Sequence, residues 1–231
     1  MSTLRLWTFA LIAVTFLSTP SAARAAWNDT TAAPNAALYG STAVFHSDTA
    51  VFPQWTDVMQ RAARDLSHQR VCASAGDASC VPAEWRALID ELAGRPLMAQ
   101  LEIVNRTFNA LPYVTAWQNW HRPSYWETPF ELLARGGQCE DYAIAKYLAL
   151  HAAGVGDNAM RVLIVRDTDL GADHAVLAVD VNGTSYLLDN LDPRIRPVAT
   201  APQYRPYYAI NLSGYWTYQG GRSELAAADG R

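Results

Sequence analysis

One cysteine in the chain occupies the position that a nucleophile needs. Cys139 follows the pair Gly136-Gly137 and precedes a run of residues that predicts a helix, so its thiol lies at a helix N-terminus. The first backbone N–H groups of a helix have no partner within the helix, and the helix dipole is positive there. Both effects favour the thiolate and lower the cysteine pKa, and the same N–H groups can stabilise an oxyanion beside the sulfur. The segment therefore predicts a cysteine nucleophile.

A base and a group that orients it are predicted from the β-rich part of the chain. His174 lies in one predicted strand, Asp189 lies near the end of the next, and the turn sequence Asn182-Gly183 joins the two strands. The register of such a two-residue hairpin makes Asp189 a diagonal neighbour of His174 on the same face. Diagonal neighbours are about 7–8 Å apart at the backbone, which a carboxylate and an imidazole can span. If the helix that carries Cys139 packs across that face, the three residues form a catalytic triad.

These residues require a helix packed on a sheet, and the periodicity of the chain predicts both. Helices are predicted over residues 53–70, 82–92, 96–110, 129–137 and 138–152, and strands over residues 161–166, 172–181, 184–191, 204–212 and 215–218. The helices come first and an antiparallel sheet follows, so the predicted fold class is α+β.

The N-terminus predicts an exported protein. Arg5 supplies a short basic region, Leu6–Leu17 is mainly apolar, and Ala23-Arg24-Ala25 matches the small-residue pattern of a cleavage site. We therefore expect a signal peptide over residues 1–25 and a periplasmic protein, with secretion as the alternative. An irregular arm is expected over residues 26–52. The formal charge of −4 excludes a general nucleic-acid binder.

The other two cysteines are predicted to form a disulfide. Cys72 and Cys80 bracket a short polar loop, and an oxidising compartment favours their pairing. Closing so short a loop stabilises a fold by about 2–3 kcal/mol in the chain-entropy model. Cys139 is then left as a free thiol, which agrees with its use as a nucleophile.

Three blocks of sequence carry a resemblance to a known family. They are Trp126-x-Thr128-Pro129-x-Glu131, the run Gly137-x-Cys139-Glu140-Asp141-Tyr142-Ala143-Ile144-Ala145-Lys146-Tyr147, and His174-Ala175-Val176-Leu177 with Leu188-Asp189-Asn190. In this order they resemble the bacterial transglutaminase-like cysteine proteinases, among them the periplasmic LapG-type proteases. The resemblance covers about residues 53–212. It implies a papain-like core in residues 53–231, with N-terminal helices packed on an antiparallel β-sheet.

The resemblance also implies an activity and its partners. The family's triad maps onto Cys139, His174 and Asp189. LapG-type enzymes cleave the N-terminal region of large surface adhesins, and an inner-membrane receptor that senses cyclic di-GMP holds them inactive. Their activity depends on calcium bound by acidic residues beside the nucleophile, which implies Glu140 and Asp141 as ligands here.

One position departs from the family pattern. The family has Asp before the cysteine, whereas this chain has Gln138. The loss of one negative charge lowers the expected calcium affinity, so no cofactor is firmly predicted. Gln138 can instead donate a hydrogen bond to the oxyanion, or serve only as a neutral residue that precedes the helix.

The sequence leaves three activities open. A protease resolves the thioester with water, whereas a transglutaminase-like acyl-transferase resolves it with an amine, and one triad serves both reactions. A non-catalytic regulatory protein of the same fold is the third. A new N-terminus in a protein substrate distinguishes the protease, and incorporation of a labelled amine distinguishes the transferase.

Overall fold

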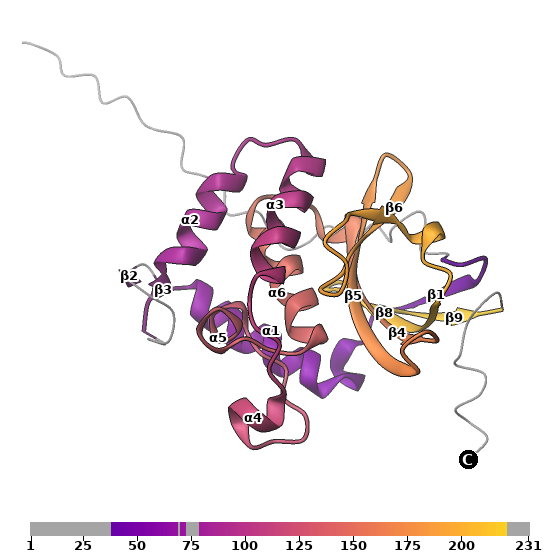
Figure 1. The fold of residues 1–231 in the computed structure, drawn as a ribbon, viewed down its shortest axis with the longest axis horizontal. Helices are drawn as coiled ribbons and strands as arrows, with labels where there is room; N and C mark the ends of the chain where they lie inside the picture. Colours follow the sequence, from indigo (N-terminus) through magenta and orange to yellow (C-terminus); the bar gives the residue numbers. More distant parts are fainter. Residues whose placement is uncertain (1–37, 69, 73–78, 221–231) are drawn as a thin grey trace, which may run out of the picture.

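The helices and the sheet form two neighbouring parts of the molecule (Figure 1). The computed structural model describes residues 38–68, 70–72 and 79–220. The predicted signal peptide and the first part of the arm, residues 26–37, lie outside these ranges. Within them, none of the helices is both long and apolar enough to cross a membrane.

The five predicted helices are present, each within a few residues of its expected bounds. They are α1 (Pro53–Leu66), α2 (Ala83–Leu92), α3 (Leu97–Asn109), α5 (Pro129–Arg135) and α6 (Cys139–Ala152). A further short helix, α4 (Ala116–Trp120), lies outside the predicted helices. Short 3₁₀ turns occupy Thr49–Val51, Asp157–Ala159 and Val198–Thr200.

The predicted antiparallel sheet is present and has additional strands. Its order is β1-β9-β8-β4-β5-β6-β7. The strands are β1 (Thr42–His46), β4 (Met160–Asp167), β5 (Ala172–Val181), β6 (Thr184–Leu188), β7 (Arg196–Pro197), β8 (Tyr204–Ile210) and β9 (Tyr215–Gln219). In the hairpin β5–β6, Val181 pairs with Thr184 and Leu177 with Leu188, so the predicted register is confirmed.

The expectation of a fully irregular arm over residues 26–52 is wrong for its C-terminal part. Residues Thr42–His46 form strand β1, which pairs antiparallel with β9 at the edge of the sheet. Ring contacts reinforce this pairing: Phe45 packs on Trp216 with centroids 5.0 Å apart, and His46 stacks on Tyr215 at 4.6 Å. The strand is short and partly exposed, and its stability comes from a partner far along the chain.

Helix α6 is the centre of the helical core. Its residues from Asp141 to Leu150 are all buried, and all of them except Asp141 and Lys146 are uncharged. It packs against the face of β5 formed by Ala175, Leu177 and Val179, which belong to the same apolar cluster. The end of β5 thus lies beside the first turn of α6.

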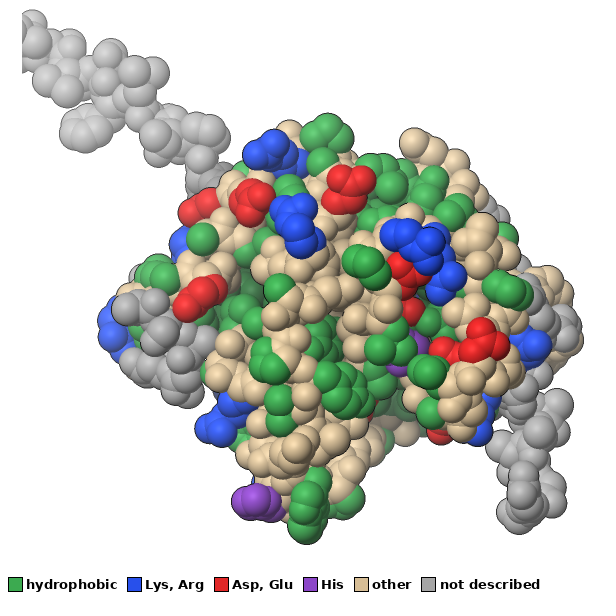
Figure 2. Space-filling model, viewed as in Figure 1, with side chains coloured by type: hydrophobic (Ala, Val, Ile, Leu, Met, Phe, Trp, Pro, Cys, Tyr) green, Lys and Arg blue, Asp and Glu red, His purple; other side chains and the backbone are tan. Residues whose placement is uncertain are grey.

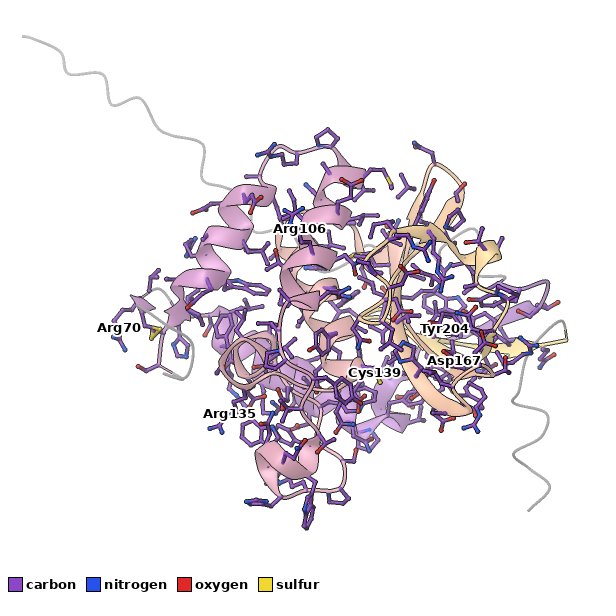
Figure 3. The ribbon with its side chains drawn as sticks, viewed as in Figure 1. Arg70, Arg106, Arg135, Cys139, Asp167 and Tyr204 are labelled. Carbon is purple, nitrogen blue, oxygen red and sulfur yellow. A yellow bond between two sulfur atoms is a disulfide. The ribbon has the colours of Figure 1, made fainter. Side chains whose placement is uncertain are left out.

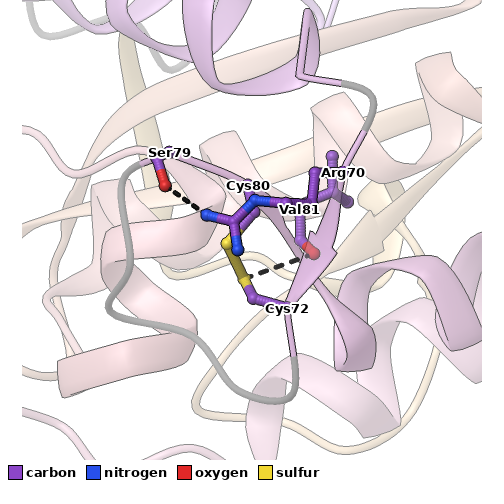
Figure 4. Close-up of a disulfide and its surroundings, with 5 residues drawn as sticks. All are labelled: Arg70, Cys72, Ser79, Cys80 and Val81. Atoms are coloured by element: carbon purple, nitrogen blue, oxygen red, sulfur yellow. Dashed lines mark hydrogen bonds between the residues drawn. A yellow bond between two sulfur atoms is a disulfide. The ribbon is translucent and has the colours of Figure 1, made fainter.

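The predicted disulfide between Cys72 and Cys80 is present (Figure 4), with 5.7 Å between the Cα atoms. It joins the short parallel strands β2 (Val71–Cys72) and β3 (Val81–Pro82), in which the N–H of Val81 also donates to the carbonyl of Arg70 at 2.8 Å. The bond fixes the connection between α1 and α2. Cys139 is the free cysteine.

Candidate active site

The turn before Cys139 requires both of its glycines. Gly136 has φ of +74°, and a Cβ atom there would lie 2.2 Å from the carbonyl oxygen of Pro112. A Cβ atom on Gly137 would lie 2.6 Å from a carboxylate oxygen of Asp141. The backbone of the turn thus passes close to Pro112 and to the Asp141 side chain. Helix α6 begins directly after this turn, with Cys139 as its first residue.

Asp141 fixes the start of α6. Its two carboxylate oxygens accept 2.7 Å hydrogen bonds from the backbone N–H groups of Glu127 and Gln138. Because Asp141 is 1% exposed, these bonds supply the partners that burial of the carboxylate demands. Asp141 therefore serves to connect the helix N-terminus to the segment before α5.

The thiol of Cys139 lies at the border between the helices and the sheet (Figure 3). It donates to Oε2 of Glu140 at 3.2 Å, and it accepts from the backbone N–H of Ala175, which follows His174. Burial raises the thiol pKa, and the charge and hydrogen bond of Glu140 raise it further, against the opposing effect of the N–H groups of Ala175 and Glu140. The expectation of a lowered pKa is wrong here, because burial and an adjacent carboxylate outweigh the helix N-terminus.

His174 and Asp189 form a hydrogen-bonded pair. The Nε2 of His174 lies 2.9 Å from Oδ1 of Asp189, and both side chains are buried. Tyr204 donates to the other carboxylate oxygen, and the backbone N–H of Leu191 donates to Oδ1 at 2.9 Å. Burial raises the pKa of Asp189, but the hydrogen bond and charge of His174, with the bonds from Tyr204 and Leu191, lower it overall. The carboxylate is ionised, so the proton lies on Nε2 and leaves Nδ1 as the basic nitrogen.

Helix α6 does not cover the face of β5 that carries His174. By alternation His174 shares its face with Val176 and Ala178, which belong to the second apolar cluster together with Tyr204. The helix packs on the opposite face, through Ala175. The thiol of Cys139 meets β5 at the backbone N–H of Ala175, the residue after His174.

A polar network behind Asp189 was missed by the sequence analysis. Asn109 donates to the carbonyl of Asp189 at 2.7 Å, and Asn105 donates to the carbonyls of Asp192 and Pro193 at 3.3 and 3.2 Å. Nζ of Lys146 donates to Oδ1 of Asn105 at 2.8 Å. Helix α3 thereby holds the loop that carries Asp189. The sequence signal that could have indicated this network is Lys146, the single lysine of the chain, which interrupts the otherwise uncharged stretch Tyr142–Leu150.

Gln138, Glu140 and Asp141 are adjacent in sequence but their oxygens do not converge. The Asp141 oxygens accept backbone amides, the Gln138 Oε1 accepts from the N–H of Ala116, and Glu140 faces the thiol. Across residues 38–68, 70–72 and 79–220, no group of three His, Cys, Asp or Glu side chains is arranged to hold a metal ion. In this arrangement the three residues do not fit a calcium site.

Acidic and basic side chains are interspersed on the face shown in Figure 2, and the basic ones are not concentrated in one patch. In the face shown in Figure 2, hydrophobic side chains gather along the middle, and charged side chains lie mostly around them. Such a surface suits a polypeptide chain better than a nucleic acid, which requires a concentration of basic side chains.

A thiol at a helix N-terminus, packed against an antiparallel sheet that carries a His–Asp pair, is the arrangement of papain-like and transglutaminase-like cysteine enzymes. The family model for bacterial transglutaminase-like cysteine proteinases matches residues 58–217. The chain belongs to this family, and it is a cysteine peptidase of the transglutaminase-like superfamily. The suspected resemblance and the predicted fold class are thereby confirmed.

Solved structures of LapG from Legionella pneumophila are similar to the chain. The calcium-bound form is 31% identical with a TM-score of 0.54, and the match covers 73% of this chain and 92% of that one. A second LapG structure gives 30% identity, a TM-score of 0.54, and coverage of 74% and 93%. An EGTA-treated form is 29% identical with a TM-score of 0.54, and the match covers 74% of this chain and 87% of that one. No curated protein matches the sequence.

Proposed function

We propose that the protein is a LapG-type endopeptidase whose nucleophile is Cys139, whose base is His174 and whose orienting acid is Asp189. The observation that carries the proposal is the 2.9 Å bond between His174 and Asp189, beside a thiol that contacts the amide of the next residue, Ala175. A nucleophile, a base and a group that orients the base are the parts that acyl transfer requires.

The resting thiol is protonated, so the base acts when substrate is bound. Nδ1 of His174 takes the proton as Sγ of Cys139 attacks the carbonyl carbon, and Asp189 stabilises the imidazolium through Nε2–H. The imidazolium then protonates the leaving amine, and the C–N bond breaks to give a thioester. Water, deprotonated by His174, attacks the thioester, and the thiol leaves with the proton as the acid product is released.

The substrate is a protein, as the peptidase family implies. By similarity to LapG we extend this to the N-terminal region of a large surface adhesin, cleaved in the periplasm under the control of an inner-membrane cyclic di-GMP receptor.

Calcium enters the proposal only through similarity to the calcium-bound LapG structure. Gln138 supplies a neutral oxygen that already accepts the Ala116 amide, and Asp141 is occupied by two amides. No step of the mechanism above uses a cation.

The test is Cys139→Ala in the exported protein, incubated with the N-terminal region of a candidate adhesin. Wild type should produce a new N-terminus at one site, and the variant should produce none while its free energy of unfolding stays within about 1–2 kcal/mol of wild type. Cleavage by the variant would refute the nucleophile. Incorporation of a labelled primary amine by wild type, without cleavage, would instead identify an acyl-transferase.

A further inference from the structure

Tyr113 lies in the loop before α4, beside the glycine turn that precedes Cys139. The segment Pro112–Val114 pairs in parallel with Gly137, two residues before the nucleophile: the N–H of Val114 donates to the Gly137 carbonyl at 3.0 Å, and the N–H of Gly137 donates to the Pro112 carbonyl at 3.3 Å. Tyr113 is thus held by backbone hydrogen bonds on both sides. Its side chain is nevertheless 57% exposed, which is unusual for an aromatic residue on so firm a support.

The phenol of Tyr113 lies within the electrostatic reach of the nucleophile. Burial of part of the ring raises its pKa, and the charges of Cys139, Glu140 and Asp141 raise it further, in that order. A phenol with a raised pKa keeps its proton near neutral pH and can donate a hydrogen bond there.

Gln138 determines which way the phenol can donate. Its Oε1 accepts from the backbone N–H of Ala116, so its NH₂ group is directed elsewhere, and a hydrogen bond from this side chain to Tyr113 lowers the phenol pKa. The Tyr113 oxygen thus acts as an acceptor toward Gln138. Among the residues that the structure describes, no protein acceptor is found for the phenol hydrogen, so this hydrogen is available to a bound substrate.

We infer that Tyr113 is a catalytic residue, whose phenol donates a hydrogen bond to the oxyanion that forms when Cys139 attacks a peptide carbonyl. This inference rests on the proposed function. The backbone N–H of Cys139 is the other donor, and Gln138 positions Tyr113 instead of contacting the oxyanion itself. The tyrosine makes and breaks no covalent bond: its O–H strengthens a hydrogen bond as charge develops on the carbonyl oxygen, which is how such donors lower a barrier.

The experiment compares two reagents that use the same thiol. Iodoacetamide alkylates Cys139 by displacement of iodide and forms no oxyanion, whereas p-nitrophenyl acetate acetylates it through a tetrahedral oxyanion. Tyr113→Phe should acetylate about 10²-fold more slowly than wild type, while its alkylation rate stays within about twofold. The phenylalanine keeps the ring, and a thermal unfolding curve checks that the variant is folded.

Tyr207→Phe is the matched control. The Tyr207 phenol donates to Asp173 at 2.9 Å, and Asp173 is an exposed residue that pairs with Arg166 and makes no contact with Cys139 or Asp189 among the described interactions. This variant should leave both rates unchanged.

The outcomes separate the two proposals. If Tyr113→Phe acetylates as fast as wild type, or loses alkylation and acetylation together, the role of Tyr113 at the oxyanion is refuted while the triad is untouched. If Cys139→Ala shows the wild-type acetylation burst, or wild type shows no burst although Cys139 is alkylated, the proposed function itself fails.

Discussion

His174 and Asp189 come from neighbouring parts of one hairpin, and their side chains meet in a 2.9 Å hydrogen bond between Nε2 and Oδ1. Strand β6 ends at Leu188, so Asp189 stands just beyond the last paired residue. There its backbone carbonyl is free to accept from Asn109. Asp189 is thus held at its backbone by Asn109 and at its carboxylate by Tyr204.

The first prediction concerns this pair. In Asp189→Asn the amide can direct its NH₂ group at Nε2, which would place the imidazole proton on Nδ1 and remove the base. Turnover should fall by about 10³–10⁴-fold. Asp173→Asn is the control, because Asp173 is exposed and pairs with Arg166. The measurement is the steady-state rate of cleavage of the substrate fragment by both variants. An equal loss of rate in Asp189→Asn and Asp173→Asn would contradict a specific role of the pair.

The second prediction concerns the thiol. Glu140 raises the pKa of Cys139 by its charge and by accepting the thiol hydrogen. In Glu140→Gln the pKa should fall, so the thiolate fraction at pH 8 rises and alkylation by iodoacetamide becomes about three- to tenfold faster. The pH–rate profile should shift to lower pH. Glu102→Gln, an exposed position of α3, should react like wild type, and a slower Glu140→Gln would refute the interpretation.

The third prediction concerns Lys146, which is fully buried. Burial lowers its pKa to about 7, with the charge of Asp189 opposing the shift. Between pH 7 and the ordinary lysine value the unfolded chain binds more protons than the folded one, so stability should rise with pH in that window and change little below it. Relative to Lys146→Met, wild type should gain about 2 kcal/mol of unfolding free energy from pH 7 to pH 9.

Urea unfolding at the two pH values measures this difference. Parallel curves for wild type and Lys146→Met would show that Lys146 does not titrate in the window. As a second readout, an amine-reactive ester should leave Lys146 unlabelled in the folded protein and label it in urea, since it is the chain's single lysine.

The fourth prediction concerns calcium. A carboxylate beside the nucleophile repels the thiolate and attracts a cation, whereas the Gln138 amide is neutral. Gln138→Asp should bind calcium at least about tenfold more tightly than wild type, which corresponds to about 1.4 kcal/mol, and its activity should become sensitive to chelator. Calorimetry on both forms measures the affinity. Tight binding by wild type, with complete loss of activity in EGTA, would overturn the argument from Gln138.

The hairpin and the contact between His174 and Asp189 were predictable because short-range rules determine them. The turn Asn182-Gly183 sets the register of β5 and β6, and the alternation of the strand then places His174 and Asp189 on one face. Likewise Thr128 caps α5 and the glycine turn begins α6, so both helices start where the sequence indicated. These features need no knowledge of distant contacts.

The remaining features depend on contacts between distant segments. Strand β1 forms only through its pairing with β9, and the interaction of Lys146 with Asn105 joins two helices. The pKa of Cys139 is raised by burial of the thiol and by the side chain of Glu140. Neither the depth of burial nor the position of that side chain can be predicted from the helical periodicity of the sequence. Which face of β5 receives α6 was likewise decided by packing.

The pairing of β1 with β9 also bears on how the molecule folds. The partners are the first and last strands of the part of the chain that the structure describes, so their contact has nearly the greatest sequence separation available. Contacts of this kind form slowly, because a long loop must close before they gain any stabilisation. We therefore expect β1 to add to the sheet in a late step, after the helices and the β4–β6 meander have assembled. Until then β9 is an open edge, and a second unfinished copy of the chain could pair with it and start aggregation.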